Sequence, residues 1–76
     1  MDELGTDDLI ARIRAGDIER YADLVRRYQQ DVRRVVGALL GDLRSTEDLV
    51  QQTFVNAYEH LDRFRPGADF AVWIKA

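Results

Sequence analysis

Residues that could bind nucleic acid are concentrated near the end of the chain. Aromatic and basic side chains alternate there and nowhere else in the sequence: Arg63, Phe64, Arg65, Phe70, Trp73 and Lys75. Aromatic rings can stack on unpaired bases, and arginine and lysine can contact phosphate. This segment is therefore a candidate for binding nucleic acid.

Packing is the competing interpretation for the aromatic residues. Phe70 and Trp73 are three residues apart at the start of a predicted helix, the spacing of side chains on one core face. Phe64 follows Leu61 closely and could hold the loop against the bundle. Arg63 and Arg65 are the stronger candidates for DNA contact, because charged side chains are mostly exposed and packing in a core does not explain them.

A second candidate surface lies on the helix predicted for EDLVQQTFVNAY and its flanks. The side opposite Val50 and Leu61 carries polar residues and one valine: Asp48, Gln51, Gln52, Val55, Asn56, Glu59 and Asp62. From Ser45 to Asp62 there are four acids and no lysine or arginine, so DNA phosphates would repel this helix.

A protein partner fits this face better than DNA does. Glutamine and asparagine both donate and accept hydrogen bonds, and Val55 adds apolar area, as in a polar but specific interface. The partner should carry arginine or lysine opposite Asp48 and Glu59. An ordinary solvated helix face is the competing interpretation.

The sequence contains little evidence of a catalytic site. The chain has no cysteine and one histidine, His60, so it cannot assemble a zinc site or a cysteine–histidine nucleophile. We expect His60 to be a surface residue near a helix end, and we expect no catalytic residue, no metal and no cofactor. A fragment of a helical hydrolase remains an alternative, which would need a metal or nucleophile set.

Length and charge favour one small, marginally stable domain. Four of the fourteen acids lie in the first eight residues, which leaves ten acids against eleven basic residues in the remainder. The apolar run from Val35 to Leu40 is far shorter than the roughly 20 residues of a membrane span. The acidic start is unlike a signal peptide, so we expect a cytoplasmic protein without membrane insertion.

The apolar pattern predicts an all-α fold, with three helices and the start of a fourth. Thr6 should cap the first helix, which ends near Gly16, and Asp17 should cap the second, which ends at Gly41. The second helix should bury a stripe at helical spacing, formed by Ile18, Tyr21, Val25, Tyr28, Val32, Val35 or Val36, and Leu39.

Ser45, with Asp48 three residues later, is predicted to open the third helix in a capping-box arrangement. Its core stripe should contain Val50, Phe54, Ala57 and Leu61, widened by Thr53 and Tyr58. Pro66 and Gly67 predict a turn, and Asp69 should cap a fourth helix that begins at Phe70 and is incomplete at Ala76.

The segment STEDLVQQTFVNAYEHLDRFRPGADFAVWIKA resembles region 2 of the bacterial sigma-70 family, in particular of the extracytoplasmic-function (ECF) sigma factors. EDLVQQTF, LDRFRPG and FAVWI occur in the family's order and spacing. The preceding RAGDIERYADLVRRYQQDVRRVVGALLGD resembles the start of the same domain. On this resemblance we expect an acidic tail at residues 1–7 and a region 2 domain at 8–76.

The resemblance implies docking on the clamp helices of the RNA polymerase β′ subunit. The residues it assigns to this role are Asp48, Gln51, Gln52, Val55, Asn56 and Glu59. Gln52 departs from the family, which usually has glutamate there, so the docking face carries one negative charge fewer.

The resemblance further implies that the loop and fourth helix melt and read the promoter −10 element, with a base of the non-template strand flipped into a pocket. The residues implied in DNA contact are Arg63, Phe64, Arg65, Asp69, Phe70, Trp73 and Lys75. An anti-sigma factor is a further expected partner.

The family continues into a longer basic helix and a second domain that binds the −35 element, neither of which is in this sequence. The alternative function is therefore a truncated interaction module that binds polymerase or an anti-sigma factor without initiating transcription.

Overall fold

The computed structural model describes residues 4–75, which form an all-helical chain and confirm the predicted fold class. The helices are α1 (Thr6–Arg14), α2 (Tyr21–Leu40), α3 (Leu43–Glu59) and α4 (Phe70–Lys75), with short 3₁₀ helices η1 (Ile18–Arg20) and η2 (Leu61–Arg63). Two expectations fall partly or wholly outside the described residues: the acidic tail, of which residues 1–3 are not described, and the incomplete end of the fourth helix at Ala76.

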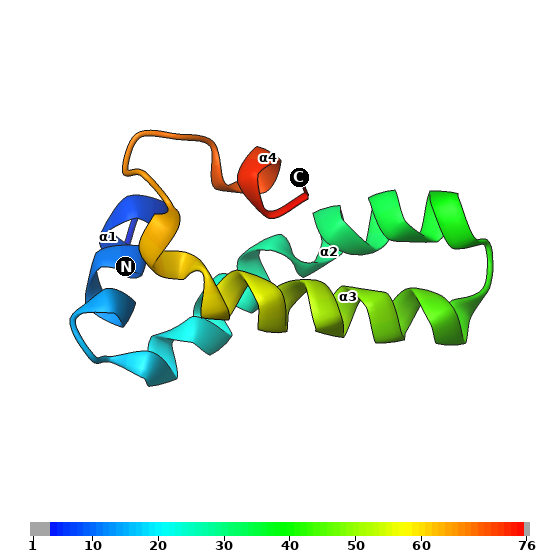
Figure 1. Ribbon diagram of the computed structural model, residues 1–76, viewed down its shortest axis with the longest axis horizontal. Coiled ribbons are helices and arrows are strands. Elements are labelled where there is room, and N and C mark those ends of the chain that lie inside the picture. The colour runs from blue at the N-terminus through cyan, green and yellow to red at the C-terminus, as the bar shows by residue number, and fades with distance from the viewer. Residues whose placement is uncertain (1–3, 76) are drawn as a thin grey trace.

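Helices α2 and α3 form a long antiparallel hairpin, with α1 and α4 gathered toward the end away from its turn (Figure 1). Gly41 ends α2 as predicted, in the left-handed conformation (φ 78°) that favours glycine. Asp42 then caps α3, because its carboxylate accepts a hydrogen bond from the Ser45 N–H at 3.0 Å. The prediction that Ser45 opens this helix is wrong, since Leu43 and Arg44 are already helical and Ser45 is the donor in the cap.

The predicted caps at Thr6 and Asp17 are also wrong. Gly5, not Thr6, precedes α1, and the Thr6 hydroxyl lies 2.7 Å from the Tyr28 hydroxyl, so it has a tertiary partner. Asp17 precedes η1 instead of α2, and its carboxylate accepts from Arg20 Nε at 2.7 Å. In both cases the side-chain oxygen is hydrogen-bonded elsewhere, and neither residue makes the predicted side-chain cap.

The core is built from all four helices and the segment after α3. Its buried residues are Leu9, Ile10, Ile13, Leu24, Val32, Val36, Val50, Phe54, Ala57, Leu61, Phe64, Phe70 and Ile74. The predicted stripe of Val50, Phe54, Ala57 and Leu61 is buried as predicted, although Leu61 lies on η2, after α3 has ended. Tyr58 does not widen the stripe, because it is 43% exposed.

The predicted stripe on α2 is wrong at its two ends. Ile18 is 57% exposed because it lies on η1, before α2 begins, and Leu39 is 78% exposed in the last turn of α2, next to the end of the helix at Gly41. Leu24, which the pattern missed, is fully buried. The core of α2 is therefore centred on Leu24, Val32 and Val36.

The turn and the last cap form as predicted. Gly67 has a positive φ of 92°, and the Ala68 N–H donates to the Arg65 carbonyl at 3.1 Å, which closes a turn around Pro66 and Gly67. Asp69 caps α4 by accepting from the Ala71 N–H at 3.0 Å. Helix α4 is short, so its stability must come from packing Phe70 and Ile74 into the core.

Candidate functional site

The polar face predicted on α3 is exposed along its length. Asp48, Gln51, Gln52, Val55, Asn56 and Glu59 all lie at the surface. Their surroundings differ, however, because four of them line a groove between α2 and α3: Asp48, Gln51, Val55 and Glu59. Asn56 lines a hollow on another side of α3, and Gln52 donates to the Asn56 side-chain oxygen at 3.0 Å.

The groove between α2 and α3, called here the acidic groove, has an apolar and aromatic interior. Val25 and Tyr21 of α2 line it together with Phe54, Val55 and Tyr58 of α3. The Tyr21 and Tyr58 rings meet edge to face, with centroids 5.0 Å apart, and the Tyr21 hydroxyl donates to the Phe54 carbonyl. Burial, with a smaller contribution from Tyr58, raises the pKa of Tyr21 to about 12, so the phenol is neutral at physiological pH.

One basic residue lies at the edge of this groove, and the sequence reasoning missed it. Arg33 of α2 donates to both carboxylate oxygens of Glu47, with Nε–Oε2 at 2.6 Å and Nη2–Oε1 at 3.0 Å. This hydrogen bonding lowers the pKa of Glu47 and raises that of Arg33. The pair could have been predicted from the turn at Gly41, because two antiparallel helices joined there bring Arg33 of one helix opposite Glu47 of the other.

Asp48 and Glu59 are the remaining acids of the groove. Neither makes an ion pair within residues 4–75, in contrast to Glu47. An arginine or lysine of a partner could therefore contact them without displacing an existing ion pair. The acidic groove thus combines apolar interior, hydrogen-bonding rim and unpaired negative charge.

The residues predicted to contact DNA divide into an exposed group and a buried group. Arg63, Arg65, Asp69 and Lys75 are exposed, and Trp73 is partly buried. Asp69 has a structural task, because it caps α4.

Phe64 and Phe70 are each only 2% exposed, with ring centroids 5.4 Å apart. In this conformation neither ring presents a face to a base, so both act as core residues, the competing interpretation that their spacing allowed.

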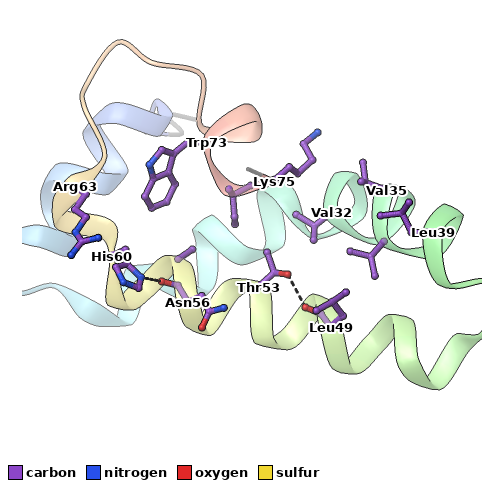
Figure 2. Close-up of a pocket in the computed structure, with 13 residues that line it drawn as sticks. Val32, Val35, Leu39, Leu49, Thr53, Asn56, His60, Arg63, Trp73 and Lys75 are labelled. Carbon is purple, nitrogen blue, oxygen red and sulfur yellow. Dashed lines mark hydrogen bonds between the residues drawn. The ribbon is translucent and has the colours of Figure 1, made fainter.

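A second hollow brings three of the exposed or partly exposed candidates together. Trp73 and Lys75 of α4 and Arg63 of η2 line it with His60, which follows α3 (Figure 2). None of its lining residues is acidic, so we call it the basic hollow. Arg65 does not line it.

Trp73 is held at the basic hollow by other aromatic residues. Its ring centroid lies 5.5 Å from that of Phe64 and 5.6 Å from that of Phe70. His60 is exposed as expected, and its Nδ1 lies 2.9 Å from the Asn56 carbonyl oxygen. The sequence analysis did not predict that His60 lies beside Arg63. The spacing could have indicated it, because His60 precedes Arg63 by three residues at a helix end.

A metal-binding cluster and a membrane-spanning helix are both absent from the described part of the chain. No group of three or more histidine, cysteine, aspartate or glutamate side chains in residues 4–75 could hold a metal ion. Within the same residues, no helix is both long and apolar enough to cross a membrane.

Comparison with known proteins gives consistent matches. Residues 24–76 match the family model for Sigma-70 region 2. The ECF RNA polymerase sigma-E factor of Escherichia coli (strain K12) is 38% identical over 77 aligned positions, which cover 97% of this chain and 39% of that protein. The ECF RNA polymerase sigma factor SigW of Bacillus subtilis (strain 168) is 29% identical over 65 residues, covering 86% of this chain and 35% of that protein. This chain thus spans less than two fifths of the length of these relatives.

Proposed function

Because this chain belongs to the sigma-70 family, as an ECF-type region 2 domain, we propose that it connects RNA polymerase to promoter DNA in transcription initiation. The observation that carries the proposal is a pair of differently charged surfaces, one between α2 and α3 and one to which η2 and α4 contribute the basic residues. The acidic groove is lined by Glu47, Asp48 and Glu59, whereas the basic hollow is lined by Arg63 and Lys75. One surface suits a basic protein segment and the other suits phosphate.

The acidic groove docks on the clamp helices of the polymerase β′ subunit. Asp48 and Glu59 meet basic side chains of the partner, Gln51 supplies hydrogen bonds, and Val55, which is 46% exposed, supplies apolar contact. Gln52 and Asn56 extend this contact at the edge of the groove. Such a mixture of an apolar centre and a polar rim is typical of specific protein interfaces.

The basic hollow and the adjoining loop bind the unpaired non-template strand of the −10 element. Arg63, Arg65 and Lys75 contact phosphates, and the partly exposed Trp73 ring stacks on a base. Phe64 and Phe70 contribute indirectly, by holding the indole in place through ring contacts. Under this proposal the protein acts with RNA polymerase in the cytoplasm.

A titration of labelled protein against a purified β′ clamp-helix fragment tests the docking half of the proposal. Asp48→Arg should weaken binding by about tenfold or more, equivalent to roughly 1.4 kcal/mol, because it places a positive charge against basic partner residues. Asp8→Arg is the matched control, since it makes the same charge change on α1, outside the groove. Equal affinities for the two variants would remove the docking assignment.

A further inference from the structure

Three side chains of helix α1 make hydrogen bonds that link it to α2 and to the segment joining α3 to α4. We define the α3–α4 connection as residues 60–69. Arg14 Nε donates to the Leu61 carbonyl at 3.0 Å, and its Nη2 donates to the Leu61 and Phe64 carbonyls. Asp7 accepts from the Gly67 N–H at 2.9 Å, so α1 holds the connection at both of its ends.

A third contact acts on the start of α4. The Thr6 hydroxyl is hydrogen-bonded to the Tyr28 hydroxyl at 2.7 Å, and the Tyr28 ring lies against Phe70, with centroids 4.9 Å apart. Phe70 is the first residue of α4. The first turn of α1 is thereby linked, through α2, to the helix that carries Trp73 and Lys75.

The connection has few backbone hydrogen bonds of its own. Those outside the helices join near neighbours, as in Arg63 N–H to the His60 carbonyl and Ala68 N–H to the Arg65 carbonyl. No backbone N–H in residues 4–75 is seen donating to the Phe64 carbonyl, so the Arg14 guanidinium satisfies an acceptor that the connection leaves open.

The two carbonyls that Arg14 binds lie on either side of Arg63. Leu61 is two residues before it and Phe64 is the residue after it, and Arg65 follows directly. A planar guanidinium holds two acceptors in a defined geometry, which a single ammonium group cannot do. The position of the backbone that carries Arg63 and Arg65 therefore depends on Arg14.

We propose that α1 is the element that positions the α3–α4 connection, with Arg14 and Asp7 as the positioning residues that orient Arg63 and Arg65 for DNA. This rests on the proposed DNA contact of Arg63 and Arg65. The proposal gives a positioning role to α1, although α1 lies outside residues 24–76, the part of the chain that matches the family model. Arg14 and Asp7 themselves need not touch DNA.

Hydrogen exchange of backbone amides tests the positioning without any DNA. Arg14→Ala should speed exchange at the Phe64 and Ala68 amides by about tenfold, the effect of losing a charge-assisted hydrogen bond, and leave Phe54 in α3 nearly unchanged. Arg12→Ala is the matched control, because Arg12 lies on the same helix and its side chain makes no hydrogen bond within residues 4–75. Arg14→Lys should restore part of the protection.

A second pair of variants, Asp7→Ala and Asp8→Ala, tests the Asp7 contact. Asp7→Ala should speed exchange of the Gly67 amide, which loses its acceptor, whereas Asp8→Ala removes the same charge from the same turn and should not. The emission of Trp73, the one tryptophan of the chain, reports on the docking of α4 in each variant. Circular dichroism checks that each variant remains helical.

Binding of a short fluorescein-labelled single strand of random sequence then tests the consequence for DNA. Arg14→Ala should weaken binding several-fold more than Arg12→Ala, while Arg63→Ala should weaken it directly. Equal exchange in the Arg14 and Arg12 variants would overturn the proposal. So would a loosened connection in Arg14→Ala with strand affinity equal to that of Arg12→Ala.

The failure of the DNA-binding function would look different. If Arg63→Ala bound the strand as well as the wild type did, the proposed function of the connection would be wrong. The exchange measurements would still decide whether α1 holds the connection, because they involve no nucleic acid.

Discussion

The α2–α3 hairpin and the α3–α4 connection are held in shape by different kinds of contact. The ends of the hairpin helices are defined by neighbours in sequence, with Gly41 ending α2 and Asp42 capping α3 through Ser45. The connection depends on residues of α1 that are 47 to 60 positions away in sequence. The candidate protein-binding surface thus lies on locally specified structure, whereas the candidate DNA-binding surface depends on a distant helix.

The largest effect should come from removing the core of the hairpin. Phe54→Ala should lower the free energy of unfolding by about 3 to 5 kcal/mol, because it opens a cavity under the acidic groove. Val55→Ala is the control, since Val55 is the next residue and is 46% exposed. Urea unfolding followed by circular dichroism measures both, and similar midpoints for the two variants would show that the hairpin core is wrongly assigned.

Two of the three glycines with positive φ in the described residues allow the same change to be made in each region. Gly41 (φ 78°) lies in the hairpin and Gly67 (φ 92°) in the connection, and nothing lies within 4 Å of an added Cβ at either site. Alanine should therefore cost about 1 to 2 kcal/mol of backbone strain in both cases, without a clash.

The readouts of these two alanine variants should differ. Gly41→Ala should lower the stability of the whole domain, seen by circular dichroism and by Trp73 emission together. Gly67→Ala should first change Trp73 emission and exchange in the connection, while the hairpin stays helical. If both variants lost all signals in one transition, the two regions would unfold as a unit and the comparison would fail.

The smallest expected effect is a loss of stability at low pH, and it should arise from carboxylates of the hairpin. Hydrogen bonds from Ser45 lower the pKa of Asp42, and hydrogen bonding from Arg33 lowers that of Glu47. A carboxylate with a depressed pKa stabilises the fold above its unfolded pKa of about 4, and this contribution is lost as the pH falls through the lower folded value.

Urea midpoints measured at decreasing pH would reveal this loss. In the Asp42→Asn, Glu47→Gln double variant the acid-dependent decline should be shallower than in the wild type, because neither side chain can ionise. Equal pH dependence in the two proteins would show that these carboxylates do not link hairpin stability to pH.

The parts of the fold that sequence reasoning predicted correctly are the locally determined ones. The end of α2 at Gly41, the turn at Gly67 and the cap at Asp69 all involve a residue type that only a few conformations favour. The buried stripe of α3 also follows from spacing alone. Asp42 and Ser45 are both of a residue type that caps helices, and the apolar pattern does not tell which of them accepts from a free N–H of the first turn.

The parts that could not be predicted depend on contacts between distant residues. An aromatic side chain can stack on a base or pack in a core, so burial of Phe64 and Phe70 became clear only with α1 and α4 in place. The Arg33–Glu47 pair and the Arg14 contacts join separate helices, and each arginine alone resembles an ordinary surface residue.

The most direct test of two separate binding surfaces is a map of amide chemical-shift changes in the same protein with each partner. Addition of the β′ clamp-helix fragment should perturb amides around the acidic groove, centred on Asp48, Gln51 and Val55. Addition of a short single strand should perturb those around Arg63, Arg65 and Trp73. Two distinct sets would agree with the account, whereas both partners perturbing the same residues would contradict it.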